Sequence, residues 1–249
     1  MFFGSLAFAD VALCIGAGFI VSIIGGLAGY GTGLLMPLVL VPIVGPEPVV
    51  PIIGVMALFT NSGRIVAFRD EINWIAVKRI LPLAMPFTVL GAIFYDHLSG
   101  RGVLRLLGFT LLALIPLRRI LKAYQFQLSE RGLIPFGALF GTLVGGTSGA
   151  GVLLISALMA TGLSGAGVIA TDAVISLVVG LVKSGSFASL GALTPAHAAL
   201  AILIGCATFP GGYVAKWLMA KLGAHVHAVL LEGAVIVGAA GLLWRAWQG

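Results

Sequence analysis

A glycine-rich run occurs twice in the chain, and each copy lies within a strongly apolar stretch. The first copy reads GGLAGYGTGL from Gly25 to Leu34, and the second reads GGTSGAGVLL from Gly145 to Leu154. Glycine permits positive φ and close approach of backbone to backbone. A helix that starts after such a break presents N–H groups without an intrahelical partner and a partial positive charge. The two runs therefore predict two helix starts at which an anion could bind.

The residues expected to bind this anion are glycines and neutral hydroxyl donors at the two breaks. They are Gly29, Gly31, Thr32 and Gly33 in the first copy, and Thr147, Ser148, Gly149 and Gly151 in the second. The alternative is that small residues here serve only close helix packing, which is common in membrane bundles. Because the run is duplicated and denser than a packing seam requires, the functional interpretation is favoured.

Two basic side chains follow the runs at roughly corresponding places in the two halves. Asn61, Ser62 and Arg64 lie near the end of the segment after the first run, and Lys183 and Ser184 occupy the comparable place after the second. A cation near the mouth of a cavity would attract an anion and compensate its lost hydration. In the alternative interpretation, both long side chains extend to the membrane interface.

One acidic residue, Asp172, lies inside an apolar segment of the second half. An intramembrane carboxylate predicts a proton relay or an ion ligand. Lys183 is about 16 Å further along a straight helix, so the two side chains are not expected to pair directly. Glu232 and His197 are comparable candidates in later segments, although each could equally lie near an interface.

A different kind of chemistry is suggested by Ser148 together with His197. The stretch Gly146–Gly149 matches the Gly-x-Ser-Gly motif of rhomboid intramembrane proteases, in which serine is the nucleophile and histidine the base. The first copy has Ala28 where Ser148 stands, so duplication explains the motif without catalysis. Leu200 stands where the rhomboid pattern expects glycine. The protease is therefore the alternative hypothesis, and we expect no enzyme.

Composition defines the class of protein that must position these residues. The chain is 60% hydrophobic and 9% charged, against roughly 25% charged residues in an ordinary soluble domain. This predicts an all-α, multi-pass membrane protein, with no room for a separate soluble domain. The net charge of +6 is attributed to topology signals between apolar segments, so no nucleic-acid partner is expected. Cys14 and Cys206 lie in apolar segments, and no metal or other cofactor is expected.

The apolar segments fall into two similar halves of about four membrane segments each. Residues 1–117 form the first repeat, 118–132 a polar connector, and 133–249 the second repeat. The segments expected to be helical are Phe8–Ala28, Leu34–Val44, Val49–Phe68, Ile80–His97, Val103–Leu117, Leu133–Val144, Val152–Gly162, Gly167–Val182, Thr194–Ala215 and Val226–Trp247.

The length of each broken region indicates how the repeats are related. From Phe8 to Val44 is 37 residues, or about 55 Å as one helix, whereas a bilayer core is about 30 Å thick. We therefore expect a helix, a break, and an arm that folds back to the same side. Each half then crosses the membrane an odd number of times, which makes the repeats inverted. Counting lysine and arginine does not decide this, because a parallel arrangement gives the same count.

With these motifs, the chain resembles the TauE/SafE family of membrane transporters, also called sulfite exporters. The resemblance rests on Gly25-Gly26-x-x-Gly29-x-Gly31-x-Gly33 followed by Leu35–Leu38, and on the second copy from Gly145 to Leu154. It implies export, or sometimes uptake, of small sulfur-containing anions such as sulfite, sulfoacetate and other organosulfonates. Thr32 stands where the family often has another glycine, and Ile155–Leu158 lacks the proline of the first arm.

Taken together, the sequence predicts a secondary anion transporter in the inner cell membrane, working by alternating access around a midplane site between the two breaks. The partners are a small anionic substrate and the lipid bilayer. Export is the expected direction. Proton coupling and facilitated diffusion remain alternatives, as do a monomer and a homodimer formed through an exposed face of small residues.

Overall fold

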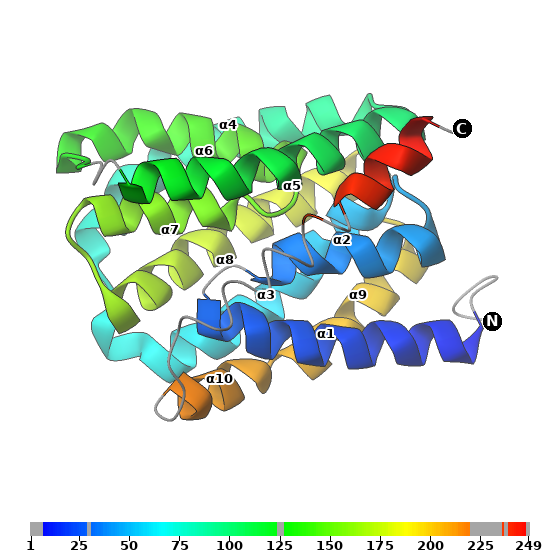
Figure 1. Cartoon of the computed structure of the whole chain (residues 1–249), viewed down its shortest axis with the longest axis horizontal. Helices are drawn as coiled ribbons and strands as arrows, with labels where there is room; N and C mark the ends of the chain where they lie inside the picture. Colours follow the sequence, from blue (N-terminus) through cyan, green and yellow to red (C-terminus); the bar gives the residue numbers. More distant parts are fainter. Residues whose placement is uncertain (1–6, 29–30, 124–126, 220–235, 237–238, 248–249) are drawn as a thin grey trace.

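The computed structural model describes residues 7–28, 31–123, 127–219, 236 and 239–247, and these ranges contain helices and no strand. The α-helices are α1 (Phe8–Ala28), α2 (Gly31–Val44), α3 (Val49–Phe68), α4 (Trp74–Asp96), α5 (Gly100–Ala123), α6 (Leu133–Gly146), α7 (Gly151–Ala160), α8 (Gly165–Ser189), α9 (Pro195–Thr208) and α10 (Gly211–Met219). They pack side by side into a bundle (Figure 1). The predicted all-α class is confirmed.

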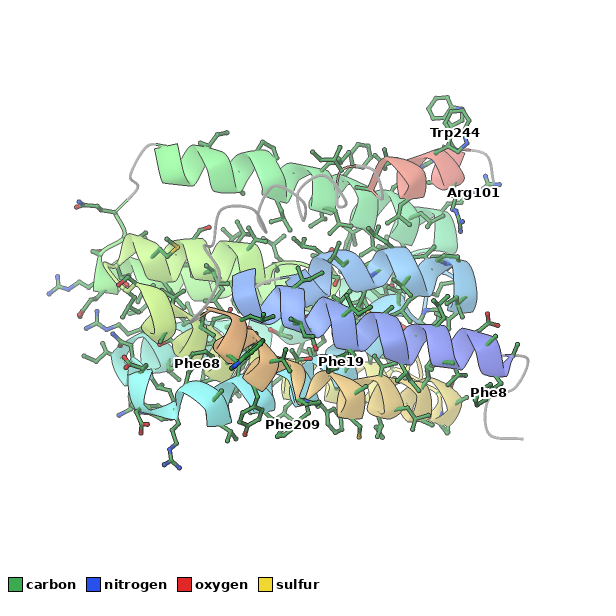
Figure 2. The ribbon with its side chains drawn as sticks, turned by 60° about the horizontal axis from the view of Figure 1, so that its bottom comes forward. Phe8, Phe19, Phe68, Arg101, Phe209 and Trp244 are labelled. Carbon is green, nitrogen blue, oxygen red and sulfur yellow. The ribbon has the colours of Figure 1, made fainter. Side chains whose placement is uncertain are left out.

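Several of these helices are long and apolar enough to cross a membrane. Within the described ranges, four stretches meet this criterion: Val49–Glu71, Trp74–Asp96, Gly165–Ser189 and Pro195–Ala215. The outer surface also carries large apolar side chains. Figure 2 shows Phe8 and Trp244 pointing away from the bundle, with 89% and 65% of their surfaces exposed. Lipid contact explains such a surface, since an exposed apolar patch of this extent would be unfavourable in water.

Both glycine-rich runs separate two helices, as the sequence predicts. α1 ends at Ala28 and α2 begins at Gly31, and Figure 1 shows α2 returning alongside α1. In the second copy, Thr147 has extended backbone and Gly149 has a φ of +90° between α6 and α7. A residue with a side chain rarely adopts that φ, so glycine is required at the turn.

The centre of the bundle is the pair α3 and α8. Gly54 on α3 lies against Ser184 on α8, and Arg64 on α3 forms an ion pair with Asp172 on α8. As residue numbers rise along α3 they fall along α8, so the two helices are antiparallel.

The helices α4 and α6 pack closely and run in the same direction. Gly137, Gly141 and Gly145 form a stripe with four-residue spacing, and this stripe lies on the backbone of α4 from Ile80 to Thr88. Glycine is needed because a Cβ at any of the three would overlap a carbonyl group of α4. Small residues spaced in this way let membrane helices approach closely.

A second parallel contact joins α1 to α9 and α10 of the second half. Gly18 of α1 lies against Ile204 of α9, and Ser22 of α1 lies against Gly211 at the start of α10. Thus a helix of the first half pairs with helices of the second, as α4 does with α6.

Several predicted segment boundaries differ from those of the structure. α4 begins at Trp74 and not at Ile80, and α8 continues to Ser189 beyond the predicted end at Val182. α5 continues to Ala123, so the polar connector expected from residue 118 begins inside a helix. The predicted segment Thr194–Ala215 is divided into α9 and α10 around Pro210, which has no N–H to continue the helical hydrogen bonds. The predicted Val226–Trp247 segment lies partly outside the described residues, and its end from residue 239 to 247 is helical.

Candidate functional site

A cavity of about 110 Å³ lies where α2, α3, α8 and the turn before α7 meet. One water needs about 10–15 Å³ of such space, so the cavity has room for a small ion. Ten of the residues predicted from the sequence line it: Thr32, Gly33, Asn61, Arg64, Thr147, Ser148, Gly149, Gly151, Asp172 and Lys183. Residues from both halves of the chain are therefore brought together in one place.

The described lining does not include the other four predicted residues. Gly29 lies outside the described residues, and Gly31 is the first residue of α2. Ser62 follows Asn61 on α3 and is not part of the lining. Ser184 lies next to Lys183 but is directed at Gly54 of α3.

The two helix starts touch each other at this cavity. A Cβ on Gly33 would lie 2.9 Å from the backbone nitrogen of Gly149, and the Ser148 hydroxyl donates a hydrogen bond of 2.6 Å to the Gly33 carbonyl. The first backbone N–H groups of α7 that donate to carbonyls of the preceding turn are those of Val152 and Leu153. Gly149, Ala150 and Gly151 precede them and line the cavity, and the amides of such a helix start carry a partial positive charge.

Lys183 supplies a buried positive charge. Lys183 is only 4% exposed. Its Nζ donates hydrogen bonds to the backbone carbonyls of Val144 at 2.7 Å and Thr147 at 2.9 Å. A cation is favoured at this position because the carbonyls belong to the C-terminal end of α6. An ammonium group has three donors, so one remains for a ligand in the cavity. The alternative that Lys183 extends to the interface is wrong.

Arg64 and Asp172 form the other charged group of the cavity. A guanidinium nitrogen of Arg64 lies 2.8 Å from a carboxylate oxygen of Asp172, and both side chains are buried. Arg64 also donates to the Asn61 side-chain oxygen, and the Ser176 hydroxyl donates to Asp172 at 3.4 Å. The interface position considered for Arg64 is therefore also wrong. Asp172 is buried, as predicted, but its partner comes from α3.

Thr147 contributes a polar atom that has no partner in the described part of the structure. The residue is 2% exposed, and its hydroxyl forms no hydrogen bond. An unsatisfied buried hydroxyl costs about 1–3 kcal/mol, and a ligand in the cavity would remove that cost. Together with the amides before α7 and the third Lys183 donor, this hydroxyl makes the cavity rich in donors, which suits an anion.

The serine and histidine of the protease hypothesis are not brought together. Ser148 donates to Gly33 on α2, whereas His197 lies in the first turn of α9, where its backbone nitrogen is capped by Thr194. His197 does not line the cavity. The third acidic or basic candidate, Glu232, lies outside the described residues.

Several lining residues were missed by reasoning from the sequence: Ile53, Gly54, Ala57, Thr60, Val144, Ala150, Ser176 and Gly180. A periodic signal does point to most of them. On α8 the lining residues Asp172, Ser176, Gly180 and Lys183 are three or four positions apart, which puts them on one face of a helix. The face of α3 that carries Asn61 and Arg64 continues in the same way toward Gly54.

A helical membrane bundle with a cavity lined by buried polar side chains, formed where two broken helices start, has the architecture of a membrane transport protein. The chain belongs to the family described as sulfite exporter TauE/SafE, whose model matches residues 14–242, nearly the whole chain. The family makes it a membrane transporter of the sulfur-anion exporter type. No curated protein and no solved structure matches the sequence.

Proposed function

We propose that this protein is a secondary transporter that carries small sulfur-containing oxyanions, sulfite or organosulfonates, out of the cell across the inner membrane. The anion binds in the cavity between the starts of α2 and α7. The observation that carries this proposal is the convergence of Lys183, of Thr147 with its unpaired hydroxyl, and of the helix-start residues Gly149 to Gly151 on one cavity. Binding and release need no covalent step, so no catalytic residue is assigned.

The chemistry of the lining favours an oxyanion. Each oxygen of a sulfite or sulfonate group accepts hydrogen bonds, and the cavity has several donors at the turn before α7. Lys183 compensates the charge, and the backbone amides before α7 add the partial charge of a helix start. A cation would instead need several carboxylates, whereas the one carboxylate in the described lining, Asp172, is already paired with Arg64.

Transport is proposed to proceed by alternating access of two inverted repeats. The antiparallel pairing of α3 with α8 supports this relation, because these helices hold corresponding places in the two halves. α2 and α7 lead away from their contact in opposite directions (Figure 1). By their order in the two halves, α1 corresponds to α6 and α4 to α9. If the two halves changed places, the parallel pair α4–α6 would therefore become the parallel pair α9–α1. Rocking of one repeat against the other would then open the cavity to either side in turn.

The proposed direction follows from the charge of the cargo. A negative potential inside the cell drives an anion outward by about 2.3 kcal/mol per charge per 100 mV. Export therefore needs no second ion, although the buried pair Arg64–Asp172 gives a place where a proton could be coupled to transport.

The test is flux of sulfite, sulfoacetate, thiosulfate, sulfate and taurine into liposomes that contain the purified protein. We expect saturable flux of at least one sulfur oxyanion, and its loss in Gly151→Leu, which fills the cavity. Gly16→Leu is the matched control, because a Cβ at Gly16 meets no atom within 4 Å. Absence of flux and binding for the whole panel would refute the proposal, and wild-type flux in Gly151→Leu would refute the site.

A further inference from the structure

We infer that the cavity is selective for singly charged anions, and that Asp172 sets this selectivity by neutralising Arg64. The inference rests on the proposed function and narrows its substrate class. Among sulfur oxyanions it favours hydrogen sulfite and sulfonates with an uncharged remainder, over doubly charged ions such as sulfate, thiosulfate and sulfoacetate.

The charged side chains of the described lining leave one positive charge without a negative partner. The ionisable side chains of this lining are Arg64, Asp172 and Lys183. The first two form an ion pair at 2.8 Å and cancel each other. Lys183 has carbonyl groups as its acceptors in the described chain, and no carboxylate. One positive charge is therefore left uncompensated, and it belongs to Lys183.

Burial makes the charge of the ligand decisive. A charge taken out of water must be matched by an opposite charge or by dense hydrogen bonding, or it is strongly disfavoured. A singly charged anion beside Lys183 leaves the cavity neutral. A doubly charged anion brings one negative charge that no cation in the described lining matches, because Arg64 is already paired with Asp172.

Different parts of a bound ligand would face Lys183 and Asp172. Lys183 and Thr147 are joined by a hydrogen bond at the start of the α7 turn, so the anionic group is held there. Asp172 is three helical turns from Lys183 along α8 and lines the same cavity. Whatever part of the ligand extends toward Asp172 meets a carboxylate and is expected to be uncharged.

The experiment compares methanesulfonate with sulfate, two ions of similar size that carry one and two charges near neutral pH. Binding of each is measured by calorimetry on the purified full-length protein, with liposome flux as a second readout. We expect the wild-type protein to bind methanesulfonate about 100-fold more tightly than sulfate, since an unmatched buried charge costs several kcal/mol. Equal or tighter binding of sulfate overturns the inference.

Asp172→Asn removes one negative charge while keeping the shape of the side chain. We expect its preference for methanesulfonate over sulfate to fall to about 10-fold or less. Asp70→Asn is the matched control, because Asp70 is exposed and paired with the exposed Arg69, and it should keep the wild-type ratio. An unchanged ratio in Asp172→Asn also overturns the inference.

A third variant keeps the inference testable if Asp172→Asn does not fold. Lys183→Gln removes the uncompensated cation and should weaken methanesulfonate binding about tenfold or more, whereas unchanged affinity overturns the inference. If the wild-type protein binds neither ion but carries sulfite with saturable kinetics, the charge rule is wrong and the proposed function stands. If it neither binds nor carries any sulfur anion, the proposed function itself is wrong.

Discussion

The guanidinium of Arg64 lies 2.8 Å from the carboxylate of Asp172, and this buried ion pair fastens α3 of the first half to α8 of the second. The same two helices carry Asn61 and Lys183, so the pair fixes the register at which both reach the cavity. Its role in the cavity and its role in folding can be separated by substitution.

Removing one partner of the ion pair should destabilise the protein strongly. Arg64→Ala leaves the Asp172 carboxylate buried without its cation, which costs about 3–5 kcal/mol of unfolding free energy. The double variant Arg64→Met with Asp172→Leu leaves no buried charge and should cost clearly less. Reversible unfolding in mixed detergent micelles measures both. A double variant that is less stable than Arg64→Ala would contradict this explanation.

Replacing Lys183 should impair transport through the loss of a cation. Lys183→Met removes the charge-assisted donor, and hydrogen bonds to charged groups contribute about 1.5–3 kcal/mol. We expect anion affinity to fall about tenfold or more, measured by the concentration that half-saturates flux. Lys78→Met is the control, because Lys78 is exposed on α4. Equal effects of the two substitutions would mean that Lys183 acts only through overall charge.

Adding a methyl group at Gly33 should push the two helix starts apart. The new Cβ would lie 2.9 Å from the Gly149 nitrogen and 3.1 Å from its Cα, and backbone atoms on both sides leave little room to adjust. Gly33→Ala should therefore reduce the maximal rate of flux while the protein still inserts and purifies. Gly16→Ala, which meets open space, should behave as wild type. Normal flux in Gly33→Ala would show that the contact is dispensable.

The glycine stripe of α6 should matter for stability and less for substrate. A Cβ on Gly141 would overlap the backbone of Ala84 on α4, and overpacking of this kind costs about 1–3 kcal/mol. Gly141→Ala should lower the thermal midpoint of the detergent-solubilised protein. Gly185→Ala on α8, where nothing lies within 4 Å of the new methyl, is the control. A midpoint unchanged in Gly141→Ala would indicate that α4 and α6 can separate at little cost.

Much of the secondary structure could be predicted from the sequence, because apolar runs and glycine breaks dominate it. The segments Phe8–Ala28 and Val49–Phe68 have the predicted bounds, and the fold-back after the first run was also predicted. α5 extends past its apolar part because arginine, leucine, lysine and alanine residues beyond Leu117 are good helix formers. Pro210 gives a signal for the break between α9 and α10 that length-based reasoning overlooked.

Many members of the site could be predicted from the sequence, but their pairings could not. Burial of Asp172 follows from the apolar residues around it, whereas its partnership with Arg64 depends on the antiparallel register of α3 and α8. A single sequence contains no direct record of that register. The burial of Lys183 could not be predicted for the same reason, since its acceptors Val144 and Thr147 belong to another segment.

The pairing of α1 with α9 and α10 has a consequence for how the protein is made. α1 is synthesised well before α9 and α10, which begin at Pro195 and Gly211 and pack against α1 as α2 does. α4 similarly waits for α6, against which it packs most extensively. Neither half therefore completes its packing alone, because α1 and α4 each gain partners from the second half. Two separately encoded halves should accumulate only when they are produced together.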